Sequence, residues 1–226
     1  MQFIRTEKLI GKENLEKIKS KNIIIFGIGG VGGYVAEALA RSGVQNLTLV
    51  DNDVVSESNI NRQIIALYST IGKNKVDVMK NRILDINPKA KVKAISKFVS
   101  KDNLKEFNLQ DYDFVVDAID NVTVKIELAV LSEVQGFNLI SCMGTGNKLK
   151  PELFEITDIY KTSVCPLAKV IRKELKERGV KSLTVLYSKE QPVCVEKGRV
   201  PCSISFTPSI AGLRIAEYVI TNIMEK

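Results

Sequence analysis

The sequence predicts an α/β protein: a Rossmann-like, mostly parallel sheet with helices on both faces, plus a C-terminal extension with a crossover loop. Continuous apolar runs of strand length at residues 22–27, 46–51 and 113–120 are typical of strands buried on both faces. Segments with apolar residues at helical spacing lie between these runs. Strands that alternate with helices favour right-handed crossovers, which make neighbouring strands parallel.

Each segment up to residue 147 has its own local signal. The first helical segment is interrupted near Gly11, the next helix ends at Gly43, and a later helix stops at Pro88. In chain order we expect a helical segment at 6–20, a strand at 22–27, a helix at 34–43, strands at 46–51 and 91–99 around a helix at 72–86, a short helix at 102–107, a strand at 113–120, a helix at 122–136 and a strand at 137–146.

The pattern is looser from residue 148 onward. Proline at the start and glycine at the end favour one helix, and three prolines mark a long loop that we expect to be mobile or to face a substrate. The expected elements are strands at 153–159 and 182–188, a helix at 166–179, the loop at 188–209 and an apolar docking helix at 210–224. We expect one domain over 1–226, made of a core at 1–147 and an extension at 148–226.

Composition narrows the function. The 226 residues are 45% hydrophobic and 26% charged, which is ordinary for a soluble globular protein. No apolar stretch reaches the roughly 18 residues that cross a bilayer, and the amino terminus lacks the apolar core of a secretory signal, so we expect a cytoplasmic protein. Histidine is absent, which excludes Ser-His-Asp and Cys-His hydrolases.

Four cysteines are present, and none of them forms a CxxC pair. A zinc clamp or a thioredoxin-like redox motif is therefore not indicated, and reduced thiols are expected. The chemistry must rest on carboxylates, lysine, arginine, a thiol or a bound ion.

The first chemical motif is GIGGVG at residues 27–32, between a buried strand and a helix. Gly27, Gly29 and Gly32 match GxGxxG, a tight turn whose backbone and helix start can approach phosphate oxygens. Asp51 ends the second strand, 24 residues after Gly27, where an acid can bind ribose hydroxyls. Nucleotide binding is favoured over a structural glycine turn, and NAD and ATP both remain open at this point.

Two cations near the polar stretch at 51–63 favour ATP. Attack on the α-phosphate of ATP creates charge that cations must meet, whereas a dinucleotide has no leaving pyrophosphate to neutralise. Arg62 and Lys75 can supply this charge. One well-placed donor to developing charge contributes roughly 3 to 4 kcal/mol.

Three further side chains complete the candidate set. Asn59 and Gln63 can add neutral donors. Asp120 follows its own buried strand at the edge where open α/β sheets bind ligands, and can hold Mg²⁺ against the phosphates. Each of these residues alone is equally well explained as a polar surface side chain, but together they favour a catalytic site.

Four motifs carry a resemblance to a known family. GIGGVGGYVAEALARSG, LVDNDVVSESNINRQ, IGKNKVDVM and DAIDNV, in this order, resemble the ThiF/HesA/MoeB superfamily of ubiquitin-activating-type adenylating enzymes over about residues 1–160. Within it, RTEKLIGKENL, NRQIIAL, ITDIYKT, PLAKVIRKELK and PSIAGLRIAEYVI make the chain most similar to the tRNA threonylcarbamoyladenosine dehydratase branch (TcdA/CsdL). Relatives that activate sulfur-carrier proteins usually carry two CxxC pairs for zinc, which this chain lacks.

The resemblance implies a reaction on tRNA. ATP would adenylate the free carboxylate of the threonylcarbamoyl group beside the anticodon. The side chain would then close on the activated carbonyl and expel AMP, giving cyclic threonylcarbamoyladenosine with net loss of water. A carboxylate is already a deprotonated nucleophile, so the first step suits a site without histidine.

The resemblance also implies roles for individual residues and for partners. It assigns the phosphates to Gly27, Gly29, Gly30 and Gly32, the ribose to Asp51, the α-phosphate and pyrophosphate to Asn59, Arg62 and Lys75, and Mg²⁺ to Asp120. It implies a homodimer in which Arg5 reaches the partner's nucleotide, and it admits a sulfur-transfer partner protein.

Two further features have competing explanations. Cys165 lies where some relatives form a thioester or persulfide, although a structural role is favoured; Cys142 is expected to be buried, and Cys194 and Cys202 to be exposed or paired. With a net charge of +7, basic side chains have two explanations, contact with tRNA phosphates or simple solvation; the candidates are Lys169, Arg172, Lys173, Lys176, Arg178, Lys197 and Arg199.

Two other classes of function remain open. An activator of a ubiquitin-like or sulfur-carrier protein would use the same ATP site on a C-terminal glycine, and a carrier protein would then stimulate ATP/pyrophosphate exchange. A non-catalytic or NAD-binding Rossmann module would release no AMP with any substrate. Arg62 and Lys75 argue against the second class.

Overall fold

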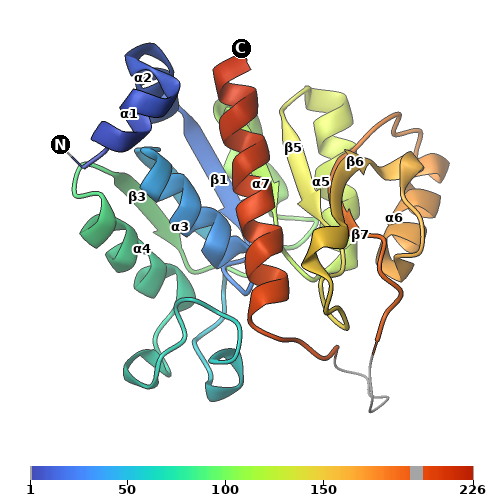
Figure 1. Ribbon diagram of the computed structural model, residues 1–226. Helices are drawn as coiled ribbons and strands as arrows, with labels where there is room; N and C mark the ends of the chain where they lie inside the picture. The colour runs from blue at the N-terminus through green and yellow to red at the C-terminus, as the bar shows by residue number, and fades with distance from the viewer. Residues whose placement is uncertain (1, 194–200, 226) are drawn as a thin grey trace.

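Seven strands form one sheet, and helices cover both of its faces (Figure 1). The computed structural model describes residues 2–193 and 201–225. The strand order is β3-β2-β1-β4-β5-β7-β6, and only the β6–β7 pairing is antiparallel. The strands are β1 Asn22–Phe26, β2 Asn46–Val50, β3 Lys91–Ile95, β4 Phe114–Asp117, β5 Leu139–Cys142, β6 Phe154–Asp158 and β7 Thr184–Ser188. The predicted fold class is confirmed.

The helices divide into two layers. The α-helices are α1 Ile4–Ile10, α2 Lys12–Ser20, α3 Gly32–Ser42, α4 Lys75–Ile86, α5 Val122–Gln135, α6 Pro166–Glu177 and α7 Phe206–Glu225. Buried residues of α2, α3, α4 and α7 share one hydrophobic cluster with the sheet, and those of α5 and α6 share a second cluster on the other face. Short 3₁₀ turns are η1 Glu57–Asn59, η2 Tyr68–Thr70, η3 Leu104–Phe107, η4 Leu109–Asp111, η5 Pro151–Leu153 and η6 Ile159–Lys161.

Strand β1 shows why the apolar runs are continuous. Ile23 and Ile25 belong to one cluster, whereas Ile24 and Phe26 belong to the other. Successive side chains of a strand point to opposite faces, so a strand covered by helices on both sides must be apolar at every position.

Most predicted helix ends are found where glycine allows a left-handed backbone. The break between α1 and α2 falls at Gly11 with φ +84°, α3 ends at Gly43 with φ +108°, and α5 ends at Gly136 with φ +76°. At Gly43 the backbone N–H donates to the carbonyls of Leu39 and Ala40 at the end of the helix.

The structure corrects several predicted boundaries. Helix α4 begins at Lys75 rather than at 72, because Gly72 and Lys73 pair with the backbone of Val55 (N···O 2.8 and 2.9 Å). The strand predicted over 91–99 ends at Ile95, where the pairing with β2 ends. The helix predicted over 102–107 is a 3₁₀ turn, and helix α7 starts at Phe206 inside the predicted loop, because Pro208 is tolerated in a first helical turn.

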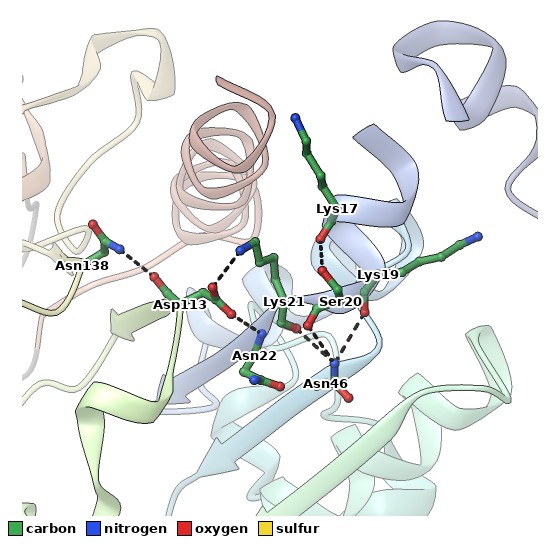
Figure 2. A network of polar contacts seen from close by, with 8 residues as sticks. All are labelled: Lys17, Lys19, Ser20, Lys21, Asn22, Asn46, Asp113 and Asn138. Carbon is green, nitrogen blue, oxygen red and sulfur yellow. Dashed lines mark hydrogen bonds and ion pairs between the residues drawn. The ribbon is translucent and has the colours of Figure 1, made fainter. Parts of the chain in front are cut away.

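A polar network ties the amino ends of four strands together (Figure 2). The Asp113 carboxylate accepts from Lys21 Nζ (2.8 Å) and from the backbone N–H of Asn22 (2.9 Å), and the Asp113 carbonyl accepts from Asn138 Nδ2 (2.9 Å). Asn46 Nδ2 lies 3.4 Å from the Lys21 carbonyl oxygen. The amino edge of the sheet is therefore closed by contacts within the protein.

Among the described helices, none has the length and apolar character that spanning a membrane requires.

Candidate nucleotide and adenylation site

The glycine turn lies at the carboxyl end of β1 and is tightly packed. Gly27 has φ +86°, and a Cβ built on it would lie 2.6 Å from the carbonyl oxygen of Ala118, which follows β4. A Cβ on Gly32 would lie 1.8 Å from the carbonyl oxygen of Gly27. Any larger side chain at either position would push β1, β4 and the start of α3 apart.

The turn is open at Gly29. Within the described residues, the nearest atom to a Cβ built on Gly29 is Gln63 Nε2, at 3.8 Å. The N-cap residue of α3, Val31, makes no side-chain cap, so the helix start can offer backbone N–H groups and a partial positive charge. These features fit the phosphates of a nucleotide.

Asp51 is tied directly to this turn. One carboxylate oxygen accepts from the N–H of Ile28 (2.6 Å), and the other accepts from the N–H of Asp53 (2.8 Å). A carboxylate oxygen can accept more than one hydrogen bond, so both oxygens retain capacity for ribose hydroxyls. The side chain also fixes the direction in which the chain leaves β2.

Lys75 is a buried cation at the amino end of α4. It is 5% exposed, and its Nζ lies 2.7 Å from Asp53 Oδ2. Its backbone N–H donates to the Asp53 carbonyl (3.0 Å). Asp51, Asp53 and Lys75 thus form a continuous series of contacts that starts at the N–H of Ile28.

Arg62 lies against the glycine turn. Its Cγ is 3.5 Å from the position of a Cβ on Gly30. Its Nη1 donates to the Ser58 carbonyl and to Asn61 Oδ1, each at 2.8 Å. Both bonds use Nη1, so within the described chain Nε and Nη2 remain for a ligand.

The two neutral candidates differ. Asn59 is 8% exposed, and its Oδ1 caps the η1 turn by accepting from the N–H of Ser56 (3.1 Å), so the amide nitrogen is the group left to donate. Gln63 is 7% exposed, and its Oε1 has no hydrogen-bond partner among the described residues. Oε1 only accepts, so a hydroxyl or N–H of a ligand can satisfy it, whereas Gln63 Nε2, which faces Gly29, is the atom that can donate to a phosphate.

Asp120 is exposed at the carboxyl end of β4, one residue before the N-cap of α5. The described residues contain no group of three or more His, Cys, Asp or Glu side chains arranged to hold a metal. A single carboxylate fits Mg²⁺, which proteins often bind through one or two carboxylates together with substrate phosphates. It does not fit a cage made of protein ligands alone.

Sequence reasoning missed a buried ion pair under this edge. Lys125 and Asp117 are 1% and 0% exposed, with Nζ 3.0 Å from Oδ2. Lys125 Nζ also donates to the Cys142 carbonyl (2.8 Å), and Ser141 Oγ donates to Asp117 Oδ2 (2.5 Å). The available signal was a lysine in the first turn of an apolar helix that follows an aspartate inside an apolar run.

The C-terminal extension reaches the glycine turn from the other side. Asn61 Nδ2 donates to the Ser203 carbonyl (3.1 Å), and a Cβ on Gly30 would lie 3.2 Å from Pro208 Cβ. A Cβ on Gly212 would lie 2.5 Å from the Val31 carbonyl oxygen. Helix α7 therefore packs closely on the start of α3 and helps to wall the site.

Two of the three described cysteines, Cys142 and Cys165, are buried. Cys142 is buried as expected, and burial raises the pKa of its thiol to about 12. Cys165 is 4% exposed at the start of α6, and Cys202 is exposed; Cys194 lies outside the described residues. Lys148 is buried and donates to the Glu190 carbonyl, and burial lowers the pKa of its ammonium.

The basic helix is only partly available to a partner. Arg172 donates to the Thr162 carbonyl (2.9 Å) and hydroxyl (2.6 Å), and Arg178 pairs with Glu127 (2.6 Å). Lys169, Lys173, Lys176 and Arg178 are exposed, although Lys173 Nζ lies 3.8 Å from Glu177 Oε1 and Arg178 is held by Glu127. The other two candidates, Lys197 and Arg199, lie outside the described residues.

Comparison with known proteins adds independent information. The model of the ThiF family matches residues 4–226. The tRNA threonylcarbamoyladenosine dehydratase of Bacillus subtilis is 41% identical over 241 residues, covering 99% of this chain and 95% of that protein. The Escherichia coli protein of the same name is 35% identical over 214 residues, covering 91% of this chain and 80% of that protein.

Solved structures give the same result. The E. coli dehydratase TcdA in complex with ATP superposes with a TM-score of 0.93 at 32% identity, over 99% of this chain and 94% of that chain. Its complex with AMP gives a TM-score of 0.92 over 98% and 93%, respectively. The resemblance carried by the four sequence motifs is confirmed: the chain belongs to the ThiF family.

Proposed function

We propose that this chain is an ATP-dependent tRNA threonylcarbamoyladenosine dehydratase, which adenylates the side-chain carboxylate of the modified adenosine and cyclises it. The observation that carries the proposal is a glycine turn that is open at Gly29, with the buried ammonium of Lys75 linked to it through Asp53 and Asp51 and the Arg62 side chain packed against Gly30. The similarity to dehydratases along the whole chain supports the choice of substrate.

In the proposed first step, a substrate carboxylate oxygen attacks the α-phosphorus of ATP, and pyrophosphate leaves. Asp51 holds the ribose, the turn at Gly29 and Gly30 accepts the phosphates, and Arg62 with Lys75 meets the charge that grows in the transition state. Donors that are fixed before the reaction need no reorganisation when that charge develops. The amide of Gln63 adds a neutral contact.

In the second step, a nucleophilic group of the same side chain attacks the acyl carbonyl, and AMP leaves with a former carboxylate oxygen. The attacking group loses a proton, and the net change to the nucleoside is loss of water. The reacting groups belong to one substituent, so closure is intramolecular and needs mainly correct orientation.

Mg²⁺ is part of the proposal. Asp120 would hold it at the carboxyl edge of β4. When bound, the ion would offset phosphate charge and help pyrophosphate to leave.

The proposed assembly is a cytoplasmic homodimer that binds tRNA. Arg5 belongs to α1, which lies at the amino edge of the strands (Figure 1), whereas the glycine turn follows the carboxyl end of β1, so the nucleotide proposed for Arg5 is the partner's. Ile4 and Leu9 on the same helix are exposed apolar side chains, which supports an interface there. Lys169, Lys173 and Lys176 are proposed contacts to tRNA phosphates, and a sulfur-transfer protein is a proposed further partner.

The test is to incubate the protein with ATP, Mg²⁺ and tRNA bearing threonylcarbamoyladenosine, and then to weigh the nucleoside. The expected result is loss of the mass of one water, with one AMP formed per nucleoside changed. An unchanged nucleoside, with AMP formed only when a ubiquitin-like or sulfur-carrier protein is added, would replace this proposal with carrier activation. No AMP with either substrate would exclude both.

A further inference from the structure

The ion pair between Lys75 and Asp53 is asymmetric. The two side chains are 7% and 59% exposed, and Nζ and Oδ2 are 2.7 Å apart. The lysine is held inside the protein at the first turn of α4, whereas the aspartate carboxylate faces water. If the pair separates, the aspartate can turn into solvent, but the lysine cannot leave without disturbing the helix start.

The backbone around Asp53 is fixed independently of its carboxylate. Its N–H donates to Asp51 Oδ1 (2.8 Å), and its carbonyl accepts from the N–H of Lys75 (3.0 Å). The neighbouring Val55 pairs with Lys73 and Gly72 through backbone hydrogen bonds. Loss of the carboxylate contact therefore leaves the backbone at Asp53 and the start of α4 in place.

A buried ammonium needs an anionic partner at all times. An unpaired buried charge is strongly unfavourable, and in the structure Asp53 supplies the compensating charge. When a nucleotide phosphate reaches Lys75, it supplies the same compensation. The Asp53 carboxylate then becomes a negative charge beside a polyanion, which is unfavourable in a partly buried site.

We infer that Asp53 is a displaceable counter-ion: it holds the ammonium of Lys75 in its binding position while the site is empty, and releases it to a phosphate group when the nucleotide binds. This inference rests on the proposed assignment of Lys75 to the phosphates. Asp53 is a positioning residue, because it touches Lys75 and not the reacting atoms. Its presence weakens phosphate binding and speeds the departure of pyrophosphate.

The decisive variant is Asp53→Asn. Asparagine keeps the shape and the backbone contacts but removes the charge. We expect ATP and pyrophosphate to bind about tenfold tighter, equivalent to roughly 1.4 kcal/mol, and adenosine to bind as in the wild type. Isothermal titration calorimetry of each ligand, without tRNA, measures these affinities.

Two matched variants separate this role from general charge effects. Asp85→Asn makes the same charge change on α4, the helix that begins with Lys75, about 15 Å along its axis from that residue. It is expected to leave the affinities for ATP, pyrophosphate and adenosine unchanged. Asp53→Glu restores the carboxylate and is expected to return ATP affinity to within about twofold of the wild type. Thermal unfolding of each variant checks that the fold is intact.

The inference is overturned if Asp53→Asn binds ATP equally or more weakly, or if adenosine affinity changes by the same factor. These outcomes leave the proposed function standing, provided that the wild type still binds ATP and dehydrates the tRNA nucleoside. A wild-type protein that binds no ATP would instead overturn the proposed function, and this inference with it.

Discussion

The amino and carboxyl edges of the same sheet both carry a lysine–aspartate pair, and the two pairs differ in how completely they are satisfied. At the amino edge, Lys21 pairs with Asp113, whose second carboxylate oxygen and carbonyl also accept hydrogen bonds (Figure 2). At the carboxyl edge, Lys75 is held by one exposed carboxylate, and Gln63 Oε1 has no partner among the described residues.

The difference shows how similar residues serve stability or binding. Groups that satisfy one another within the protein gain nothing from a ligand, whereas groups that are only partly satisfied are ready to bind one. The buried pair of Lys125 and Asp117 lies beneath the carboxyl edge. It resembles the amino-edge pair of Lys21 and Asp113 in being satisfied within the protein, which supplies all the contacts described for it. It supports the site without facing it.

Breaking the buried pair should have the largest effect. Lys125→Met leaves the buried Asp117 carboxyl without its ammonium partner, and we expect a loss of about 3 to 5 kcal/mol in the free energy of unfolding. Urea denaturation measures this loss. The double variant Lys125→Met with Asp117→Asn should recover much of it, and a failure to recover would mean that packing, not charge, dominates here.

Breaking the pair in the site should affect catalysis more than stability. Lys75→Ala removes a cation from the developing phosphate charge, so we expect turnover to fall about 10²- to 10³-fold, equivalent to roughly 3 to 4 kcal/mol. The rate of AMP formation with modified tRNA measures the effect. Lys21→Ala is the matched variant at the amino edge, and should leave that rate unchanged; a comparable loss there would contradict the division between the two edges.

Removing the Asp113 contacts at the amino edge should lower the free energy of unfolding and leave ATP binding unchanged. Asp113→Ala removes one ion pair and one acceptor for a backbone N–H, so we expect a loss of about 1 to 3 kcal/mol. Chemical denaturation reports the loss, and the dissociation constant of ATP should not change. Weakened ATP binding in this variant would show that the amino edge influences the site.

The smallest effect is expected from a change at Glu37, a carboxylate that belongs to neither edge of the sheet. Burial of Glu37 opposes its ionisation, but hydrogen bonds from Arg82 and Arg41 outweigh burial and lower the pKa of this carboxyl below its ordinary 4.5. A lowered folded-state pKa stabilises the protein above pH 4.5, and that contribution is lost as pH falls through the folded-state value. Glu37→Gln should therefore destabilise at pH 7 and show less loss of stability on acidification, as measured by thermal melts across this range.

Local sequence signals predicted the backbone positions that shape the site. Gly27, Gly32 and Gly43 lie where a close backbone approach or a positive φ demands glycine, and such demands are visible in a short stretch of sequence. The end of β2 at Val50, directly before Asp51, follows from an apolar run that stops at an acid. Predicted helix and strand boundaries were wrong where a residue pairs with a distant part of the chain. The backbone N–H of Gly72, for example, donates to the Val55 carbonyl, so α4 cannot begin there.

The sequence by itself determined the order of strands and helices, the glycine turn and the set of residues that gather after the strands, because these depend on side-chain periodicity and backbone freedom. Only the tertiary structure decided which charges meet. It paired Lys125 with Asp117 in the interior and Lys75 with the exposed Asp53, because burial, which sets the strength of each pair, arises only when distant elements pack together.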